Sequence, residues 1–489
     1  MDRRRTKIVV TLGPATSERS MIERLVAAKV DVVRLNFSHG SHDEHAERIK
    51  LIREITEEKG HTVTLLQDLQ GPKIRTGEIS GGGVSLTQGE SLTLTIEPMM
   101  GNEKIVSVDY EDLPTTVQPG GRIMLDDGSL ELVVVGVDEG RVETKCVLGG
   151  VLKPHKGVNL PGARLNIPAF TDKDAEDLEF GLQNGIDAVA MSFVRTPADL
   201  APVRQAIRNL APERRHIPVI AKLERPEALE NLHEIIQVSD GVMVARGDLG
   251  VEMPPEAVPI AQKRIIQAAN EHAKVVITAT QMLDSMIKNP RPSRAEASDV
   301  ANAIFDGSDA VMLSGETAVG MYPIQAVEMM DAIIRRAEAQ LDEWGHWGGS
   351  LGEAASTEGF LKEGRHDDAL SITRAARELA DDRNVAAIAV FTETGRTAQL
   401  MAKARPKSPI LAFTPVEYTY RQLPMLWGVI PFLVPYADTL EAMLKDVEKA
   451  IVTTTPLKPG QQVVLLSGFP IGAMRPPNMA LLHTIGVLD

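Results

Sequence analysis

The chain has 489 residues, and at roughly 100 to 200 residues per domain this length predicts about three domains. Hydrophobic residues make up 43% and charged residues 24%, which is typical of globular proteins and excludes wholesale disorder and fibrous classes. The 67 acidic and 52 basic residues leave a net charge of −15, which disfavours nucleic acid and anionic membranes as partners.

The cysteine count and the N-terminus bear on the compartment. The single cysteine, Cys146, cannot form an intramolecular disulfide, so we expect a reducing, cytoplasmic setting. The apolar stretch after the basic N-terminus, from Ile8 to Val10, is too short for a signal peptide, and we expect no membrane span.

Short β-branched runs alternate with longer helical patterns, which indicates repeated βα units around a parallel sheet. Two helices are expected to begin at capping boxes, Ser41 with Glu44 and Thr171 with Asp174, and the first to end near Gly60. Eight strands are the count for a (β/α)8 TIM barrel, which we assign to residues 1–72 and 169–343. The strand candidates are Ile8–Leu12, Val32–Leu35, Thr64–Asp68, Ala188–Phe193, Val219–Leu223, Val242–Ala245, Val275–Thr278 and Ala310–Leu313.

The stretch between the third and fourth strands interrupts this pattern. Over residues 73–168 helical periodicity stops, and short alternating pieces such as Val84–Thr87 and Leu92–Ile96 stand between glycines. We therefore predict an inserted all-β domain. Because it leaves the barrel at a βα loop, it is expected to cover the C-terminal face of the strands as a mobile lid.

The C-terminal quarter returns to an α/β pattern. Residues 344–364 are rich in Gly, Ser and Glu and are interpreted as a linker. Residues 365–489 are predicted to form a smaller open α/β domain with a regulatory role. Its strand candidates are Val385–Phe391, Ile410–Phe413, Val429–Val434 and Val463–Leu466.

Charged residues stand where two neighbouring strands leave the barrel. Strand alternation puts Lys222 and Glu224 on one face at the exit of the fifth strand, and Asp248 follows the sixth strand. Adjacent carboxylates at this face make a hard oxygen site suited to Mg²⁺. The alternative is a plain ion pair between Lys222 and Glu224 that fills the barrel.

Further polar groups follow other strands. Arg34, Asn36 and Ser38 share parity after the second strand, so one face offers a phosphate-binding guanidinium and two oxygen ligands. Taken alone, Ser38 is more often a turn residue or a cap than a ligand. Thr280, after the seventh strand, could bind a carboxylate or relay a proton, or simply reflect β-propensity.

Six motifs in sequence order resemble pyruvate kinase, and the resemblance covers essentially the whole chain, including the inserted and the C-terminal domains. They are Arg34 to Gly40, Ala221 to Glu224, Met243 to Gly250, Ala279 to Leu283, Ile287 to Pro292 and Ser314 to Ala318.

The resemblance implies an enzyme that transfers the phosphoryl group of phosphoenolpyruvate to ADP, giving pyruvate and ATP, in glycolysis. It also implies a homotetramer that requires Mg²⁺ (or Mn²⁺). The resemblance implies that Glu224 and Asp248 bind Mg²⁺ and that the Lys222 ammonium faces the phosphoryl group during transfer. It implies that Arg34 and Arg75 contact phosphate and that His39 and Lys156 contact ADP. Thr280 and the amides of Gly247 and Asp248 are implied to bind the substrate carboxylate.

One departure from the family pattern concerns the monovalent cation. The family's K⁺ is bound near Asn36, Ser38, Asp68 and the carbonyl of Leu69, and Lys73 here replaces an acidic residue of the usual loop. Its ammonium could supply the positive charge internally, so we predict activity without K⁺. The alternative is an exposed lysine at the hinge of the lid.

A second departure concerns regulation. A loop in the C-terminal domain resembles the family's effector-phosphate pocket, but Glu393 adds negative charge there and puts activation by fructose 1,6-bisphosphate in doubt. A sugar monophosphate, a nucleoside monophosphate and no activator at all remain open as alternatives. The candidate effector residues are Thr392, Thr394, Gly395, Arg396 and Thr397.

A rival from another enzyme class is a barrel lyase or aldolase that handles pyruvate-type enolates. It would share the Mg²⁺ carboxylates but would need neither ADP nor a lysine in the lid.

Overall fold

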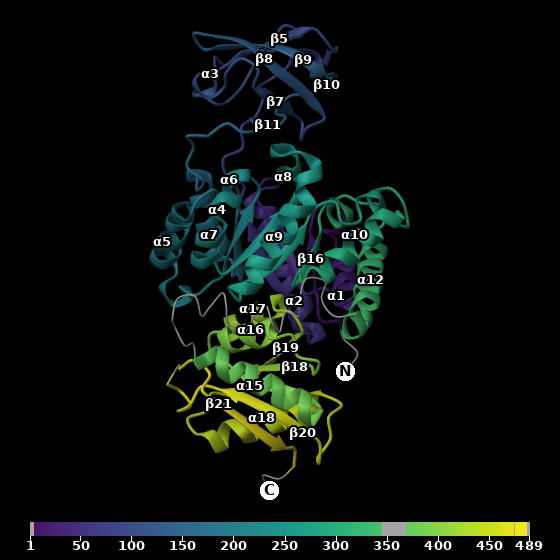
Figure 1. The fold of residues 1–489 in the computed structure, drawn as a ribbon, viewed down its shortest axis with the longest axis vertical. Helices are drawn as coiled ribbons and strands as arrows, with labels where there is room; N and C mark the ends of the chain where they lie inside the picture. The colour runs from purple at the N-terminus through teal and green to yellow at the C-terminus, as the bar shows by residue number, and fades with distance from the viewer. Residues whose placement is uncertain (1–3, 345–367, 474, 487–489) are drawn as a thin grey trace.

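The computed structural model describes residues 4–344, 368–473 and 475–486, and it has three parts stacked along the long axis. A β-rich part lies at one end, a barrel in the middle and an α/β part at the other end, as Figure 1 shows. The predicted linker, 344–364, falls almost wholly outside the described residues. No helix in the described part of the chain is both long and apolar enough to cross a membrane.

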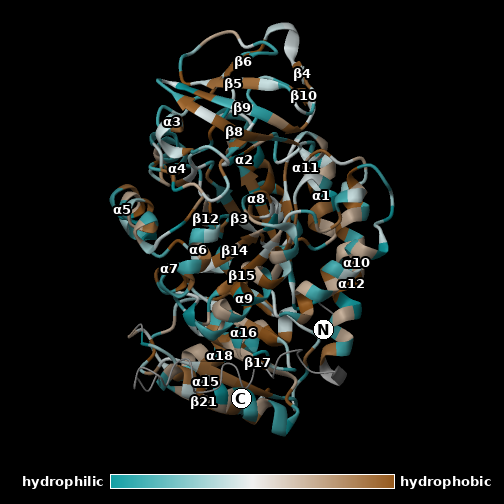
Figure 2. Ribbon diagram, turned by 45° about the horizontal axis from the view of Figure 1, so that its top comes forward, coloured by the Kyte–Doolittle hydropathy of each residue, from teal (hydrophilic) through white to brown (hydrophobic). Residues whose placement is uncertain are grey.

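The predicted barrel is confirmed as a closed sheet of parallel strands in the order β1-β16-β15-β14-β13-β12-β3-β2. Seven of these strands are buried at every residue, and in β2 only Arg34 and Asn36 are half-buried. Figure 2 shows the strands as the hydrophobic centre of the molecule. The strands are β1 (Lys7–Thr11), β2 (Val32–Asn36), β3 (Thr64–Asp68), β12 (Ala188–Met191), β13 (Val219–Leu223), β14 (Gly241–Ala245), β15 (Val275–Ala279) and β16 (Ala310–Leu313).

Helices surround the barrel and begin as expected. The capping boxes at Ser41 and Thr171 are both formed, and α2 ends at Gly60 in the left-handed conformation that favours glycine (φ 59°). The helices are α1 (Arg19–Ala27), α2 (His42–Lys59), α4 (Asp172–Gln183), α5 (Leu200–Leu210), α6 (Pro226–Glu230), α7 (Leu232–Val238), α8 (Arg246–Glu252), α9 (Val258–Glu271), α10 (Arg294–Phe305), α11 (Gly315–Ala318) and α12 (Pro323–Trp344).

The insertion between β3 and β12 forms its own sheets over its own hydrophobic core. A six-stranded sheet has the order β11-β7-β8-β9-β5-β6, and β10 pairs with β4. One four-residue helix, α3 (Leu113–Thr116), accompanies the strands. The strands are β4 (Val84–Leu86), β5 (Ser91–Thr95), β6 (Ile105–Ser107), β7 (Arg122–Leu125), β8 (Leu130–Asp138), β9 (Arg141–Leu148), β10 (Gly150–Leu152) and β11 (Val158–Asn159).

The C-terminal domain is an open sheet in the order β19-β18-β17-β20-β21, in which β21 alone is antiparallel among the described strands. The four predicted strands are present, and β21 is an addition. The elements are α15 (Asp368–Arg383), β17 (Ala387–Phe391), α16 (Arg396–Lys403), β18 (Ile410–Thr414), α17 (Glu417–Gln422), β19 (Val429–Leu433), α18 (Leu440–Thr454), β20 (Gln462–Ser467) and β21 (Met479–Thr484).

This domain is fastened to the floor of the barrel, where the strands begin. One hydrophobic cluster joins interior barrel residues to Met425, Leu426 and Trp427. Asp309, which precedes β16, accepts charged partners from both Lys403 and Arg405 in and after α16. The C-terminal domain therefore contacts the opposite end of the barrel from the β insertion.

Candidate active site

A cavity of about 310 Å³ lies between the C-terminal rim of the barrel and the β insertion. The barrel contributes His39 and Asp248 to its wall, and the insertion contributes Asp126 and Lys156. The insertion thus covers the face where barrel active sites lie, which is the position predicted for a lid.

Lys222 is the centre of a buried charged cluster beside this cavity. Its Nζ lies 2.8 Å from Glu224 Oε1 and 3.2 Å from Asp68 Oδ1, and it donates a 2.7 Å hydrogen bond to Ser192 Oγ. Burial alone would lower the pKa of Lys222, but the two carboxylates outweigh it and raise the pKa above its usual value. The ammonium therefore stays charged across the physiological range.

Asp68 connects Lys222 to Arg34. Arg34 Nε donates to Asp68 Oδ2 at 2.6 Å, and Arg34 Nη1 donates to Thr11 Oγ1 at 3.1 Å, so the guanidinium is held in one orientation. Burial would raise the pKa of Asp68, but Lys222 and Arg34 lower it below its usual range. Asp68 Oδ1 is buried and accepts no hydrogen bond of good geometry, so it is left to electrostatic pairing.

Glu224 and Asp248 place two carboxylates close enough to influence each other. Burial raises the pKa of Glu224, the charge of Asp248 adds to this, and Lys222 opposes it. Together with Asp68 they set three carboxylates against the two cations Lys222 and Arg34, an excess of one negative charge. These hard oxygen donors fit a divalent cation that completes its shell with substrate and water. Within the described ranges no group of three His, Cys, Asp or Glu forms a metal cluster by itself.

Thr280 is held in a strained backbone conformation after β15. Its φ is 66°, a region that β-branched residues avoid, and Gln281 follows with φ 54°. Arg246 fixes this loop by donating to the carbonyls of Ala279 and Thr280. The Thr280 hydroxyl accepts from the Gly247 amide at 2.8 Å, so the predicted carboxylate-binding groups are adjacent.

Basic groups face the cavity from the lid and its hinge. Lys156 Nζ pairs with Asp126 at 2.8 Å, and Arg75 Nη1 donates to the carbonyl of His155. Burial lowers the pKa of His39, and the charges of Lys73, Arg75 and Arg34 lower it further. Lys73, Arg75 and Lys156 therefore bring positive charge to the lid side of a cavity that Asp248 also lines.

The predicted monovalent-cation residues lie together at the rim, because Asn36 and Asp68 are register partners in β2 and β3. Asn36 Oδ1 already accepts from the Ser38 amide at 3.2 Å, and the Leu69 carbonyl accepts from Ser192 Oγ at 2.7 Å. Lys73 is exposed and lines the cavity beside His39, whereas the ion pairs of Asp68 come from Arg34 and Lys222.

The predicted effector residues lie far from this site, at the start of α16. A cavity of about 120 Å³ is lined by Thr392, Thr394, Arg396 and Thr397, and Glu393 also faces it. Gly395 does not line this cavity and instead adopts the left-handed conformation (φ 83°) that begins the helix.

Ser192 was missed by the sequence interpretation. It follows β12, which lies between β3 and β13 in the sheet, so its hydroxyl reaches both Lys222 and the Leu69 carbonyl. Arg195 and Arg225 were also missed. They donate to carbonyls of the returning lid segment at Leu165, Ile167 and Ala163, and so attach the lid to the rim. The signal was a polar residue within four positions of the end of β12 or β13.

A closed parallel barrel with a charged C-terminal rim under an inserted lid defines a barrel enzyme with a site for anionic substrates. The family model for the pyruvate kinase barrel domain matches residues 3–327, and the model for the pyruvate kinase alpha/beta domain matches residues 370–483. The chain belongs to the pyruvate kinase family and is an enzyme of the phosphotransferase class.

Curated relatives named pyruvate kinase match along nearly the whole chain. The protein from Staphylococcus haemolyticus is 45% identical over 486 residues, which are 99% of this chain and 81% of the relative. The protein from Sporosarcina psychrophila is 43% identical over 487 residues, with 99% and 81% covered. The protein from Staphylococcus aureus (strain MRSA252) is 44% identical over 485 residues, with the same coverage.

Proposed function

We propose that this chain transfers the phosphoryl group of phosphoenolpyruvate to ADP, giving pyruvate and ATP in glycolysis, and that it requires Mg²⁺ or Mn²⁺ but not K⁺. The observation that carries this proposal is the buried Lys222 ammonium, held between Asp68 and Glu224 at the barrel rim. Membership of the pyruvate kinase family supports the choice of substrates.

Phosphoryl transfer needs positioning and charge neutralisation more than covalent chemistry. The positive charges of Lys222 and Arg34 would neutralise the negative charge of the phosphoryl group during transfer. Asp68, which pairs with both side chains, fixes their positions. Arg75, on the lid side of the cavity, would contact phosphate from the other side. A preorganised cationic pair of this kind costs no reorganisation at the moment of transfer.

Glu224 and Asp248 would hold the divalent cation, because they are two carboxylates close enough to influence each other in a cluster with one excess negative charge. When bound, the cation would neutralise phosphate charge and orient the substrate. Thr280 and the amides of Gly247 and Asp248 would bind the substrate carboxylate, and the strained loop held by Arg246 keeps them aligned.

ADP would bind on the lid side of the cavity. His39 is kept neutral and Lys156 is positioned by Asp126, so the first can accept or donate a hydrogen bond and the second can meet a phosphate. Independence from K⁺ is supported by Lys73, whose charge acts on His39, the residue next to Ser38.

The regulatory part of the proposal rests on the loop before α16. A phosphorylated effector would bind the hydroxyls of Thr392, Thr394 and Thr397 together with Arg396. Burial raises the pKa of Glu393, whose carboxylate faces the same cavity and opposes a bound phosphate. The test is the rate as a function of phosphoenolpyruvate concentration, measured with a sugar monophosphate, a nucleoside monophosphate or fructose 1,6-bisphosphate. If none of them shifts this saturation curve, the effector part of the proposal is wrong. A homotetrameric, cytoplasmic enzyme remains part of the proposal through the family.

The test is pyruvate formation by the purified chain from phosphoenolpyruvate with Mg²⁺, in the presence and absence of ADP. We expect pyruvate only with ADP, and loss of activity when EDTA removes the divalent cation. Pyruvate released at the same rate without ADP would contradict the proposal and favour the lyase alternative.

A further inference from the structure

The turn that follows β12 lies against two groups of the candidate active site. Ser192 is buried, and its Oγ accepts a 2.7 Å hydrogen bond from Lys222 Nζ. The next residue, Phe193, donates its amide to Glu224 Oε2 at 2.8 Å. A hydroxyl and an amide of consecutive residues therefore hold the lysine and the carboxylate that lie side by side at the end of β13.

The hydroxyl of Ser192 has a fixed direction. It has one proton, and it donates this proton to the Leu69 carbonyl at 2.7 Å. Because an ammonium is a donor, a lone pair of Ser192 Oγ must point at Lys222. Ion pairs such as those of Lys222 with Asp68 and Glu224 tolerate a range of directions, whereas a hydrogen bond weakens steeply with angle. The contact with Ser192 therefore sets the orientation of the ammonium.

The backbone of this turn is strained. Phe193 has φ 55°, in the left-handed region that residues with a bulky side chain rarely adopt. Strain of this kind persists where the surrounding contacts over-determine the conformation, and it is concentrated at functional sites. The turn ends the extended backbone of β12 and presents its hydroxyl and its amide to Lys222 and Glu224.

The loop after β3 packs directly on the same turn. The Leu69 amide donates to the carbonyl of Ala190 in β12, and the Leu69 carbonyl accepts from Ser192. Gly71 follows with φ 68°, and a Cβ there would lie 2.9 Å from Phe193 Cδ2 and 3.0 Å from Ser192 Cβ. Glycine therefore lets the loop lie against the turn without a gap. The same loop leads into the lid, so Ser192 lies between the lid connection and Lys222.

We propose that Ser192 is a positioning residue for phosphoryl transfer, whose hydroxyl orients the Lys222 ammonium and links it to the loop that leads into the lid. Ser192 acts through Lys222 rather than on the substrate. A displacement of the loop at Leu69 would move the hydroxyl and, with it, the ammonium. Since Leu69 also supplies a predicted ligand of the monovalent cation, the same hydroxyl joins that site to Lys222. The inference rests on the proposed function, because it gives Ser192 a part in that reaction.

The test is steady-state kinetics of ATP formation from phosphoenolpyruvate and ADP with Ser192→Ala, which removes the hydroxyl and little volume. We expect kcat to fall by about tenfold to a hundredfold, because a misdirected ammonium neutralises the phosphoryl group less well during transfer. The KM for phosphoenolpyruvate should stay within about twofold, because the charge of Lys222 remains at the site. An unchanged kcat would overturn the proposal.

A double-mutant cycle separates positioning from a general loss of structure. In the background of Lys222→Met there is no ammonium left to orient, so Ser192→Ala should lower kcat there by less than about twofold. An equal loss of kcat in the wild-type and Lys222→Met backgrounds would show that the hydroxyl acts on another group, and it would overturn the proposal.

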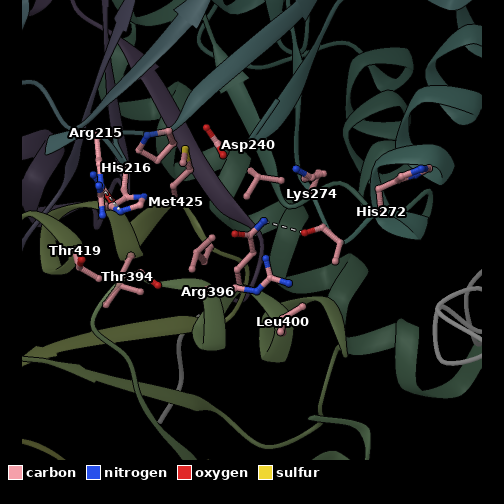
Figure 3. A pocket seen from close by; sticks show the side chains of 18 of the residues that line it. Arg215, His216, Asp240, His272, Lys274, Thr394, Arg396, Leu400, Thr419 and Met425 are labelled. Carbon is pink, nitrogen blue, oxygen red and sulfur yellow. Dashed lines mark hydrogen bonds between the residues drawn. The ribbon is translucent and has the colours of Figure 1, made fainter. Parts of the chain in front are cut away.

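The floor of the barrel offers a matched control. A cavity of about 450 Å³ lies there between the barrel and the C-terminal domain, and Figure 3 shows Asp240 entering it from the barrel side. Ser239, the residue before Asp240, is buried like Ser192, and its hydroxyl donates to the carbonyl of Ile236 at 3.3 Å. Ser239→Ala should keep kcat within about twofold of the wild type. A loss as large as that in Ser192→Ala would show that kcat responds to any buried hydroxyl, against the proposal.

The wild type separates this inference from the proposed function. If the wild type forms ATP and Ser192→Ala forms it at the same kcat, the role of Ser192 alone is wrong. If the wild type forms no ATP from phosphoenolpyruvate and ADP, the proposed function is wrong, and the role of Ser192 with it.

Discussion

Lys222 Nζ lies 2.8 Å from Glu224 Oε1 where β13 leaves the barrel, and both side chains are buried. The ion pair considered from the sequence is therefore present, but it does not stand alone. Asp68 and Ser192 hold the same ammonium from two neighbouring strands, and Asp248 acts on the same carboxylate. This network at the C-terminal rim supports the catalytic role that we propose for Lys222 over a barrel-filling ion pair.

Lys222→Met is expected to lower kcat by a factor on the order of 10³ while the KM for phosphoenolpyruvate changes little, because the charge is needed in the transition state. Steady-state kinetics with a parallel thermal unfolding scan would separate this from loss of stability. Lys403→Met makes the same change at a buried lysine of α16, which pairs with Asp309 at the barrel floor, and should keep kcat within a few-fold. A full rate in Lys222→Met would refute the role.

Lys73 is expected to make the enzyme independent of K⁺. The wild-type rate should be similar in KCl and in tetramethylammonium chloride, and Lys73→Glu should lose most of its rate in tetramethylammonium and recover it in KCl. Lys153→Glu changes an exposed lysine of the lid and should behave like the wild type. Wild-type activity only in KCl would show that Lys73 does not replace the ion.

His39 should take up its proton at lower pH than an ordinary histidine of pKa 6.5, because burial and three nearby cations disfavour the imidazolium. Removing one of those charges in Lys73→Met should raise the pKa of His39, whereas Lys73→Arg should leave it low. NMR titration of the assigned imidazole measures this. An unchanged midpoint in Lys73→Met would mean that the ammonium does not reach the Ser38–His39 turn.

The contact between the barrel floor and α16 is expected to depend on pH. Burial lowers the pKa of Lys403 from 10.5 to about 8, against the attraction of Asp309. Between these values the unfolded chain binds a proton that the folded chain does not, so the lysine's contribution to the free energy of unfolding rises with pH there. The wild-type urea midpoint, measured relative to that of Lys403→Met, should rise between about pH 8 and 10. If the urea midpoints of the wild type and of Lys403→Met change in parallel over this pH range, the prediction is wrong.

The barrel could be predicted because each strand is a short apolar run with a polar end, and the eight runs differ from the observed strands by at most two residues. The largest difference is at β12, where Phe193 has φ 55° and ends the extended backbone two residues early. β21 was missed because it pairs antiparallel with β20 at the edge of the sheet, and none of its residues is fully buried.

The site could be predicted one strand end at a time but not as a network. Asp68, Ser192 and Lys222 come from the ends of three adjacent strands, β3, β12 and β13, and the whole lid separates β3 from the other two in the sequence. Local alternation shows which side chains share a face of one strand, whereas contacts between strands depend on the register of the closed barrel. The pairing of Lys222 with Asp68 therefore needed the structure.

The most direct measurement of the central claim is ³¹P NMR of phosphoenolpyruvate, ADP and Mg²⁺ with the wild-type chain and with Lys222→Met. The account predicts that the phosphoenolpyruvate resonance falls as the γ-phosphate resonance of ATP grows, and that this exchange is nearly absent in the variant. Phosphorus released by the wild type as inorganic phosphate, with no γ-phosphate formed, would contradict it.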